Sequence, residues 1–130
     1  MAKKLFAYGT LKDPVIQTAL FGRRLNGYAA HIKNWGLFMA QEGYLFVKPC
    51  AGGHVDGLIL ELESEDMEKA DLWEDLNVYR REICCAVNDT GEESVYIYTR
   101  RSATGSAHHD DGLHGRNISE ILQDIEHLFQ

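Results

Sequence analysis

At 130 residues the chain has the length of one typical domain, and its 45% hydrophobic and 25% charged residues exclude a disordered or collagen-like protein. The 13 Lys and Arg against 20 Asp and Glu give a net charge of −7, and the cations occur as scattered pairs, so we expect no nucleic-acid partner. No apolar stretch approaches the ~20 residues that a membrane-crossing helix needs, so we expect no membrane partner either.

The first elements are predicted to be a strand, a glycine loop and a short helix. Lys3 to Tyr8 is typical of a strand, which ends at Gly9. Asp13 then supplies a helix N-cap and is followed by a proline at the first helical position. Apolar residues at helical spacing predict a helix over Pro14 to about Phe21, and Gly22 marks its end.

The middle of the chain predicts antiparallel strands and then a second helix. Residues 25–55 are rich in aromatic residues and glycine, which favours several short strands and tight turns. Val55 to Leu62 alternates, with three leucines on one face, and is typical of a strand. Ser64 is expected to cap a helix that runs to about Asp75 and has acidic residues in its first turn.

The last third predicts a hairpin, a loop and a closing helix. Tyr79 to Val87 and Ser94 to Thr99 are strand-like and are joined by turn residues. Residues 101–116 are polar and glycine-rich, which favours a long loop. Residues 117–130 carry an apolar stripe, which predicts an amphipathic helix that docks on its own domain or on a partner. We therefore expect one α+β domain over residues 1–130, with a mostly antiparallel sheet that could close into a small barrel.

The first candidate functional element is the glycine corner, Tyr8 to Leu11, where the opening strand ends. A corner of this kind exposes backbone N–H groups that can hold a carboxylate or the oxyanion of a reacting carbonyl. On these four residues alone, a simple turn is the better explanation of the glycine.

The second candidate is Glu74, which shares one face of the predicted helix with Met67 and Ala70. A carboxylate that faces an apolar interior has a raised pKa, which suits a general base near neutral pH. Periodicity alone favours the alternative that Glu74 is solvated near the end of an acidic helix.

The third candidate is the start of the hairpin, with Tyr79 and Arg81. They share one face of the strand with three less polar residues, Ile83, Cys85 and Val87. A phenol and a guanidinium at the edge of an apolar side could each meet a carboxylate. The alternative is a structural arginine paired with an acid of the preceding helix. For Tyr98, in the last strand, a position in the core or at its rim is a better explanation than a role in a site.

Possible metal ligands are clustered in one polar segment: His108, His109, Asp110, Asp111 and His114. Adjacent ligands in a glycine-bearing segment are poorly pre-organised, and no outlying Cys or His completes a familiar spacing, so we expect no metal site. Cys50, Cys84 and Cys85 form neither a CxxC motif nor a disulfide framework. Because the N-terminus also lacks the pattern of a secretory signal, we expect a cytoplasmic protein.

The order of these segments is more specific than any one of them: Leu5 to Leu11 with its Tyr-Gly-Thr-Leu run, Val55 to Leu62, Ala70 to Glu74, Tyr79 to Arg81, and Val95 to Tyr98. In this order they resemble the gamma-glutamylcyclotransferase-like family over roughly residues 4–100. The resemblance implies a small mixed, mostly antiparallel β-barrel with flanking helices.

The resemblance also implies a cofactor-independent enzyme, of the acyltransferase or C–N lyase type. Such an enzyme converts a gamma-glutamyl amine, amide or peptide to 5-oxoproline and a free amine. It assigns the general acid/base role to Glu74. It assigns the substrate pocket to Tyr8, Gly9, Thr10, Leu11, Tyr79, Arg81 and Tyr98. Two departures occur near the acid, because Ala70 stands where the family often has leucine and Asp75 where it often has glycine.

Two alternatives stay open at this stage. The same glycine corner could bind a small carboxylate metabolite without catalysis, and the C-terminal helix could dock a partner protein. The sequence also leaves open the leaving amine and the choice between a monomer and a homodimer.

Overall fold

A computed structural model describes residues 3–40, 45–101, 106–107 and 118–128. In chain order the elements are β1 (Lys3–Ala7), the 3₁₀ turn η1 (Thr10–Lys12), α1 (Pro14–Phe21), β2 (Gly27–Met39), β3 (Leu45–Leu62), α2 (Ser64–Glu74), β4 (Tyr79–Asn88), β5 (Gly91–Arg100), β6 (Ser106–Ala107) and α3 (Ile118–Leu128).

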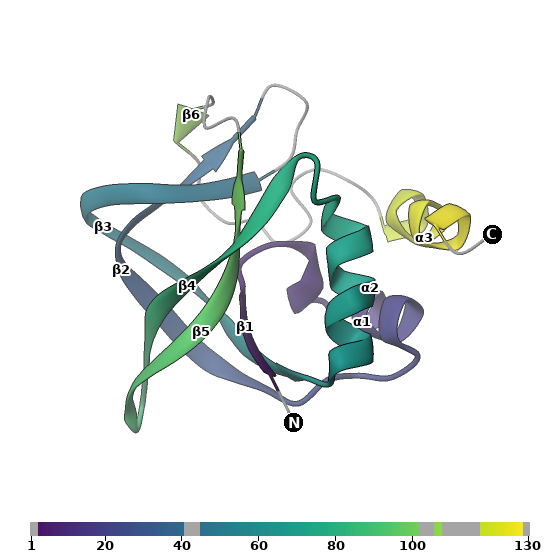
Figure 1. The fold of residues 1–130 in the computed structure, drawn as a ribbon, viewed down its shortest axis with the longest axis horizontal. Coiled ribbons are helices and arrows are strands. Elements are labelled where there is room, and N and C mark those ends of the chain that lie inside the picture. The colour runs from purple at the N-terminus through teal and green to yellow at the C-terminus, as the bar shows by residue number, and fades with distance from the viewer. Residues whose placement is uncertain (1–2, 41–44, 102–105, 108–117, 129–130) are drawn as a thin grey trace.

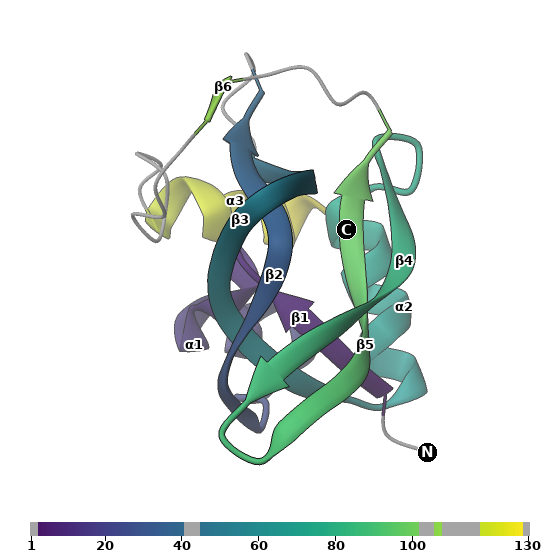
Figure 2. The ribbon, with the colours of Figure 1, turned by 90° about the vertical axis from the view of Figure 1, so that its left-hand side faces the viewer.

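The strands form a closed barrel, as the family resemblance implied. They are ordered β3-β1-β5-β4-β2, and β2 pairs again with β3 to close the ring, while β6 adds to the outer side of β2. β1 and β5 are parallel, and the other neighbours are antiparallel. The three helices lie together on one side of the barrel (Figure 1; Figure 2). The predicted α+β architecture with a small mixed barrel and flanking helices is therefore confirmed.

The predicted first helix and its caps are confirmed. The Asp13 carboxylate accepts a 2.8 Å hydrogen bond from the N–H of Val15, and Pro14 is the first helical residue. Gly22 ends the helix at φ 80°, a left-handed conformation that glycine adopts without a Cβ penalty. These local signals fix the direction in which the chain leaves the glycine corner.

The prediction of several short strands over residues 25–55 is wrong, because this region lies almost entirely in two long strands, β2 and β3. The pairing register shifts between Lys33 and Trp35, at a bulge where Asn34 has φ 64°. Across the pair, the N–H of Gly52 donates a 3.0 Å hydrogen bond to Asn34 Oδ1, with φ 77° at Gly52. Gly52 therefore does not end a strand; it lies opposite the bulge, inside a continuous strand pair.

Two apolar layers hold the structure together. One fills the barrel interior and includes Phe6, Ile32, Ile59 and Ile97, each at most 1% exposed. The other lies between the barrel and the helices. It contains the predicted leucine face of β3: Leu58, Leu60 and Leu62. β3 is thus covered on both faces at this point.

The second helix begins where the sequence predicts, but its cap differs. Glu63, not Ser64, is the N-cap residue, and its N–H donates a 2.9 Å hydrogen bond to Asp66 Oδ2. The helix ends at Glu74, followed by Asp75 with φ 61°. The hairpin is also confirmed, with Asn88 opposite Gly91.

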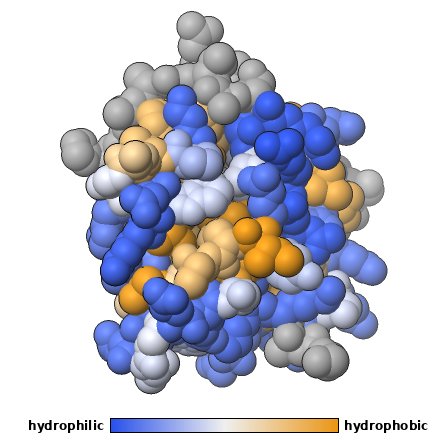
Figure 3. All heavy atoms as spheres, turned by 60° about the vertical axis from the view of Figure 1, so that its left-hand side comes forward, coloured by the Kyte–Doolittle hydropathy of each residue, from blue (hydrophilic) through white to orange (hydrophobic). Residues whose placement is uncertain are grey.

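The prediction that Ile83 and Cys85 belong to an apolar face of β4 is wrong. Ile83 is 69% exposed and Cys85 is exposed, whereas Ala86 is fully buried in the barrel interior. Tyr79 is buried because the helix layer covers that end of the strand. The helices cover only part of the barrel wall, so an outward-facing apolar residue beyond them is left in solvent. Figure 3 shows an apolar patch, bordered by hydrophilic side chains, on a barrel side of the molecule.

The C-terminal helix docks on its own chain. Ile121 and Ile125 of the predicted stripe are at most 3% exposed and pack in the layer that α1 and α2 also line. The two ends of the predicted helix, residues 117 and 129–130, and most of the predicted loop lie outside the described residues. Within the described part of the chain, no helix has the length and apolar character to span a bilayer.

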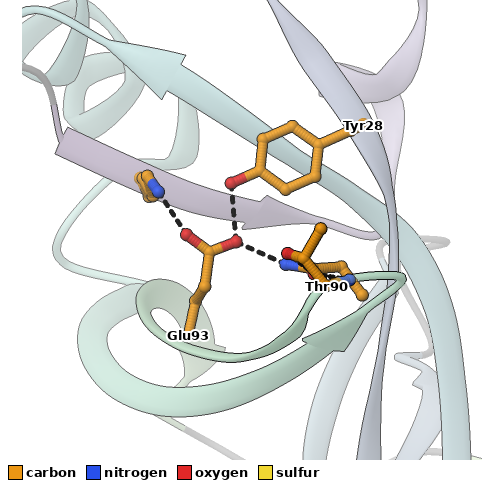
Figure 4. A network of polar contacts seen from close by, with 5 residues as sticks. Tyr28, Thr90 and Glu93 are labelled. Atoms are coloured by element: carbon orange, nitrogen blue, oxygen red, sulfur yellow. Dashed lines mark hydrogen bonds and ion pairs between the residues drawn. The ribbon is translucent and has the colours of Figure 1, made fainter.

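A polar network ties the hairpin turn to β1 and β2 (Figure 4). Glu93 forms an ion pair with Lys4 and accepts a 2.7 Å hydrogen bond from the hydroxyl of Tyr28 and another from Asn88. Asn88 Oδ1 in turn accepts hydrogen bonds from the N–H and the hydroxyl of Thr90, at 2.8 and 2.7 Å. The lysine and the hydrogen-bond donors hold the pKa of Glu93 below its usual value.

Candidate active site

A cavity of about 460 Å³ opens where β1 ends, against the C-terminal end of α2 and one face of α3. Its wall combines backbone of the glycine corner, aromatic side chains and carboxylates. The lining residues from the barrel and the glycine corner are Leu5, Phe6, Ala7, Tyr8, Gly9, Thr10, Leu11, Leu45, Tyr79 and Tyr98. Those from the helices and the turn after α2 are Leu72, Trp73, Glu74, Asp75, Val78, Asp124 and Leu128.

The glycine corner turns the chain from β1 into η1 at the cavity wall. Its carbonyls are used, because Gly9 O accepts from the N–H of Lys12 at 3.1 Å and Thr10 O from the N–H of Asp13 at 3.0 Å. Among the described residues, the N–H groups of Gly9, Thr10 and Leu11 donate no hydrogen bond. These three donors are therefore available to an anionic or carbonyl group in the cavity.

A buried glutamine that the sequence analysis missed holds the corner in place. The Gln17 side chain is 2% exposed. Its amide nitrogen donates a 2.8 Å hydrogen bond to Leu11 O, and its oxygen accepts from the N–H of Leu25 at 2.9 Å. This glutamine lies on α1, so the helix clamps the loop that precedes it. Only its position on the apolar side of the helix could have indicated a structural role.

Glu74 is the last residue of α2 and faces the cavity. Burial raises the pKa of Glu74 to about 7, because the low-dielectric surroundings disfavour the charged form. A carboxyl with this pKa exchanges protons readily near neutral pH. Burial, not the neighbouring Asp75, causes the shift. The Asp75 carboxylate instead accepts a 3.0 Å hydrogen bond from the N–H of Asn77.

Three tyrosines line the cavity with hydroxyls that are already committed as donors. Tyr8 donates to the carbonyl of Tyr98, and Tyr79 to the carbonyl of Leu45, each at 2.6 Å. Tyr98 donates to Asp71 Oδ1, also at 2.6 Å. Burial raises the pKa of both Tyr8 and Tyr98; the charge of Glu74 adds to the shift of Tyr8, and the hydrogen bond to Asp71 adds to that of Tyr98. These phenols stay neutral at physiological pH, and their lone pairs can accept hydrogen bonds.

Arg81 is the one predicted pocket residue that is not among the lining residues of the cavity. Its Nε lies 3.1 Å from Asp71 Oδ1, the same oxygen that accepts from the Tyr98 hydroxyl. The alternative of an arginine paired with a helix acid is therefore confirmed. Arg81 reaches the cavity wall through Asp71 and Tyr98, which makes it a positioning residue.

The two candidate segments far apart in the sequence meet at this cavity. Trp73 Nε1 lies 3.4 Å from the hydroxyl oxygen of Thr10, a long hydrogen bond that joins α2 to the glycine corner. Figure 1 shows the end of β1, η1 and α2 gathered on the helical side of the barrel. Glu74 and the Gly9–Leu11 backbone thus border one space. Their assigned roles in catalysis and binding stay predictions.

The sequence analysis missed the contributions of Leu45, Val78 and α3. Leu45 and Val78 add apolar wall, and Asp124 and Leu128 bring a carboxylate and an apolar side chain from α3. The apolar stripe of the C-terminal helix signalled that it docks, but not where. The segment over residues 108–114, where we expect no metal site, lies outside the described residues.

The comparisons agree with the fold and order of segments. The family model described as gamma-glutamyl cyclotransferase, AIG2-like, matches residues 5–116. No protein with a curated description matches the sequence.

Solved structures show the same fold. A solution structure from Arabidopsis thaliana aligns with a TM-score of 0.72 and 21% identity, covering 97% of this chain and 83% of that one. A structure entitled gamma-glutamyl cyclotransferase has a TM-score of 0.72 and 13% identity, with coverage of 98% and 99%. An AIG2-like protein from Mus musculus has a TM-score of 0.68 and 19% identity, with coverage of 90% and 97%. The chain belongs to the AIG2-like gamma-glutamyl cyclotransferase family.

Proposed function

We propose that this protein is a gamma-glutamyl cyclotransferase, which converts a gamma-glutamyl amine, amide or peptide to 5-oxoproline and a free amine. The observation that carries the proposal is the position of Glu74. Glu74 lines the same cavity as Gly9–Leu11, whose N–H groups donate no hydrogen bond among the described residues, and its pKa is raised to about 7. A proton-transfer group thus stands beside donors suited to a developing oxyanion.

In the proposed reaction the nucleophile and the electrophile belong to one molecule. The α-amino nitrogen of the glutamyl group attacks its own γ-carbonyl carbon, and Glu74 takes a proton from that nitrogen. The tetrahedral intermediate then collapses, and the C–N bond to the leaving group breaks. Glu74 returns the proton to the leaving nitrogen. No water is consumed, and the carboxyl ends in its starting state.

The glycine corner has two tasks in this proposal. N–H groups of Gly9, Thr10 and Leu11 hold the glutamyl part and stabilise negative charge on the γ-carbonyl oxygen. Removing one such donor typically costs about 3–4 kcal/mol of transition-state stabilisation. Holding the flexible glutamyl chain bent for five-membered ring closure exploits effective molarity, worth several kcal/mol in well-oriented reactions.

The tyrosines shape the pocket and orient the substrate. The hydroxyl oxygens of Tyr8 and Tyr98 can accept hydrogen bonds from the N–H groups of the neutral α-amino group, since their own protons are engaged elsewhere. The leaving amine, the oligomeric state and a cytoplasmic location stay predictions.

The test is the detection of 5-oxoproline by mass spectrometry after incubation with a mixed library of gamma-glutamyl amines and peptides. The wild type is expected to form it, and Glu74→Gln to lose at least about a hundredfold in rate, in the range of general acid/base catalysis. Glu68→Gln, an exposed change on the same helix, is the matched control and keeps the rate. Ligand-induced thermal stabilisation without any turnover would instead indicate a non-catalytic carboxylate-binding protein.

A further inference from the structure

Two histidines and an aspartate, none of them a lining residue of the cavity, meet on the outer wall of the barrel. His31 lies on β2, and His54 and Asp56 lie on β3. His31 is the direct register partner of Asp56, and Lys33 is the partner of His54. Because side chains alternate along a strand, these residues share one face, opposite to the inward-facing Ile32 and Val55.

The three side chains are close enough to share an ion. One ligand atom from each of them, two imidazole nitrogens and a carboxylate oxygen, lie within 4.8 Å of one another. His54 Nε2 is already 2.7 Å from Asp56 Oδ1, and the rings of His31 and His54 stack with centroids 4.6 Å apart. A tetrahedral zinc ion with bonds of about 2.0–2.2 Å holds its ligand atoms roughly 3.4 Å apart. Rotation of side chains alone could close that difference.

The backbone under this cluster is held firmly. The register is continuous from Gly27 opposite Leu60 to Lys33 opposite His54, without an irregularity inside the cluster. Behind it, Ile32 is fully buried and Val55 is 3% exposed. The ligand positions therefore come from two paired strands rather than from a loop, which lowers the cost of organising them around an ion.

The ligand types select the class of ion. Imidazole nitrogens favour zinc, copper and nickel, whereas magnesium and calcium prefer oxygen ligands. We propose that His31, His54 and Asp56 form a surface binding site for a divalent transition ion, with Zn²⁺ as its representative. The protein supplies three ligands, and the exposure of His54 and Asp56 leaves the remaining coordination to water.

The charges around the cluster set a limit on its affinity. Asp56 supplies the only negative ligand, its carboxylate interacts electrostatically with Lys12, and Lys33 pairs with the backbone of His54. Two lysines near an incoming dication oppose binding. The site is therefore weaker than a buried four-ligand zinc site.

The test is isothermal titration of the metal-free full-length chain with ZnCl₂, in the presence of a non-thiol reductant. One Zn²⁺ is expected to bind at this site. His31→Ala, His54→Ala and Asp56→Asn are each expected to weaken binding by at least about tenfold, because each removes a direct ligand. Melting curves without zinc check that the three substitutions leave the fold intact.

The matched control is the triple change His108→Ala, His109→Ala and His114→Ala, which removes the other histidine cluster and is expected to leave binding at the strand site unchanged. Titration with Co²⁺ separates histidine from cysteine ligation, since thiolate ligands add strong near-ultraviolet charge-transfer absorption. The proposal is overturned if wild type and His54→Ala bind Zn²⁺ equally, if neither binds, or if only the triple variant loses binding.

Discussion

The hydroxyl of Tyr98 and the guanidinium of Arg81 converge on one carboxylate oxygen, Asp71 Oδ1, at 2.6 and 3.1 Å. This arrangement links a residue of the cavity wall to a residue outside it. Asp71 Oδ1 fixes the direction of the Tyr98 O–H, and the Arg81 guanidinium helps to hold that carboxylate in place.

Removal of the shared acceptor is expected to destabilise the fold more than removal of the arginine. Asp71→Ala leaves the Tyr98 hydroxyl without its partner and should cost about 1–3 kcal/mol. Arg81→Gln removes only a partly exposed ion pair and should cost less than about 1 kcal/mol. Urea unfolding measures both, with Arg80→Gln on the same strand as control. Equal losses for the two variants would contradict this division of roles.

Glu74 is expected to make stability depend on pH. Its folded pKa of about 7 lies above the ordinary value of 4.5, so the folded state binds the proton more tightly than the unfolded state does. The free energy of unfolding therefore falls as pH rises from about 4.5 to about 7, and it becomes independent of the Glu74 titration above pH 7. At pH 8 Glu74→Gln should exceed the wild type in stability by about 3 kcal/mol, because the difference of about 2.5 between the two pKa values converts at about 1.4 kcal/mol per pH unit.

The measurement for this prediction is urea unfolding at pH 5 and pH 8 for both proteins. The advantage of Glu74→Gln should be small at pH 5 and larger at pH 8. Glu68→Gln controls for the loss of one negative charge on the helix. The same advantage at both pH values would show that Glu74 is ordinarily solvated.

The close approach of β3 to β1 should make Gly57 intolerant of a side chain. A Cβ at Gly57 would lie 2.3 Å from Ala7 O, just before the glycine corner. Because backbone would have to move, Gly57→Ala should cost at least about 2–3 kcal/mol. Gly91→Ala is the comparison, since its Cβ meets open space and only its φ of 134° opposes the change. A smaller loss at Gly57 than at Gly91 would argue against this contact.

The Glu93 network is expected to matter only while Glu93 is ionised. Its pKa is lowered mainly by Lys4 and Tyr28, so the stabilisation is present above the ordinary carboxyl range and is lost as pH falls through the lowered pKa. Glu93→Gln should therefore lower the melting temperature at pH 7 but not in strong acid. Glu92→Gln, on the adjacent residue of the same hairpin, is the control. An equal loss at both pH values would contradict the electrostatic account.

Local signals in the sequence predicted the elements whose causes are local. Asp13, Pro14 and Gly22 delimited α1, and the turn after Asn88 located the hairpin. The long strands β2 and β3 were missed because their bulge depends on a contact between Asn34 and Gly52, eighteen residues apart. A glycine at a bulge and a glycine at a turn look alike without the partner strand.

The residues of the candidate site that belong to the family motifs could be predicted from the sequence, and the others could not. The resemblance led to Glu74 and to the glycine corner, which the structure places around one cavity. It could not indicate Asp124 and Leu128, because the resemblance ended near residue 100 and docking of α3 is a tertiary property. The outward position of Arg81 likewise depends on which part of the barrel the helices cover.

The most direct test of the proposed reaction is the rate of 5-oxoproline formation as a function of pH, for the wild type and for Glu74→Gln. Because the unprotonated carboxyl accepts the first proton, kcat/KM should rise with pH and level off above an inflection near pH 7. Glu74→Gln should show a residual rate without that inflection. An undiminished rate in Glu74→Gln, with the same pH profile, would contradict the assignment of Glu74 as the general acid/base.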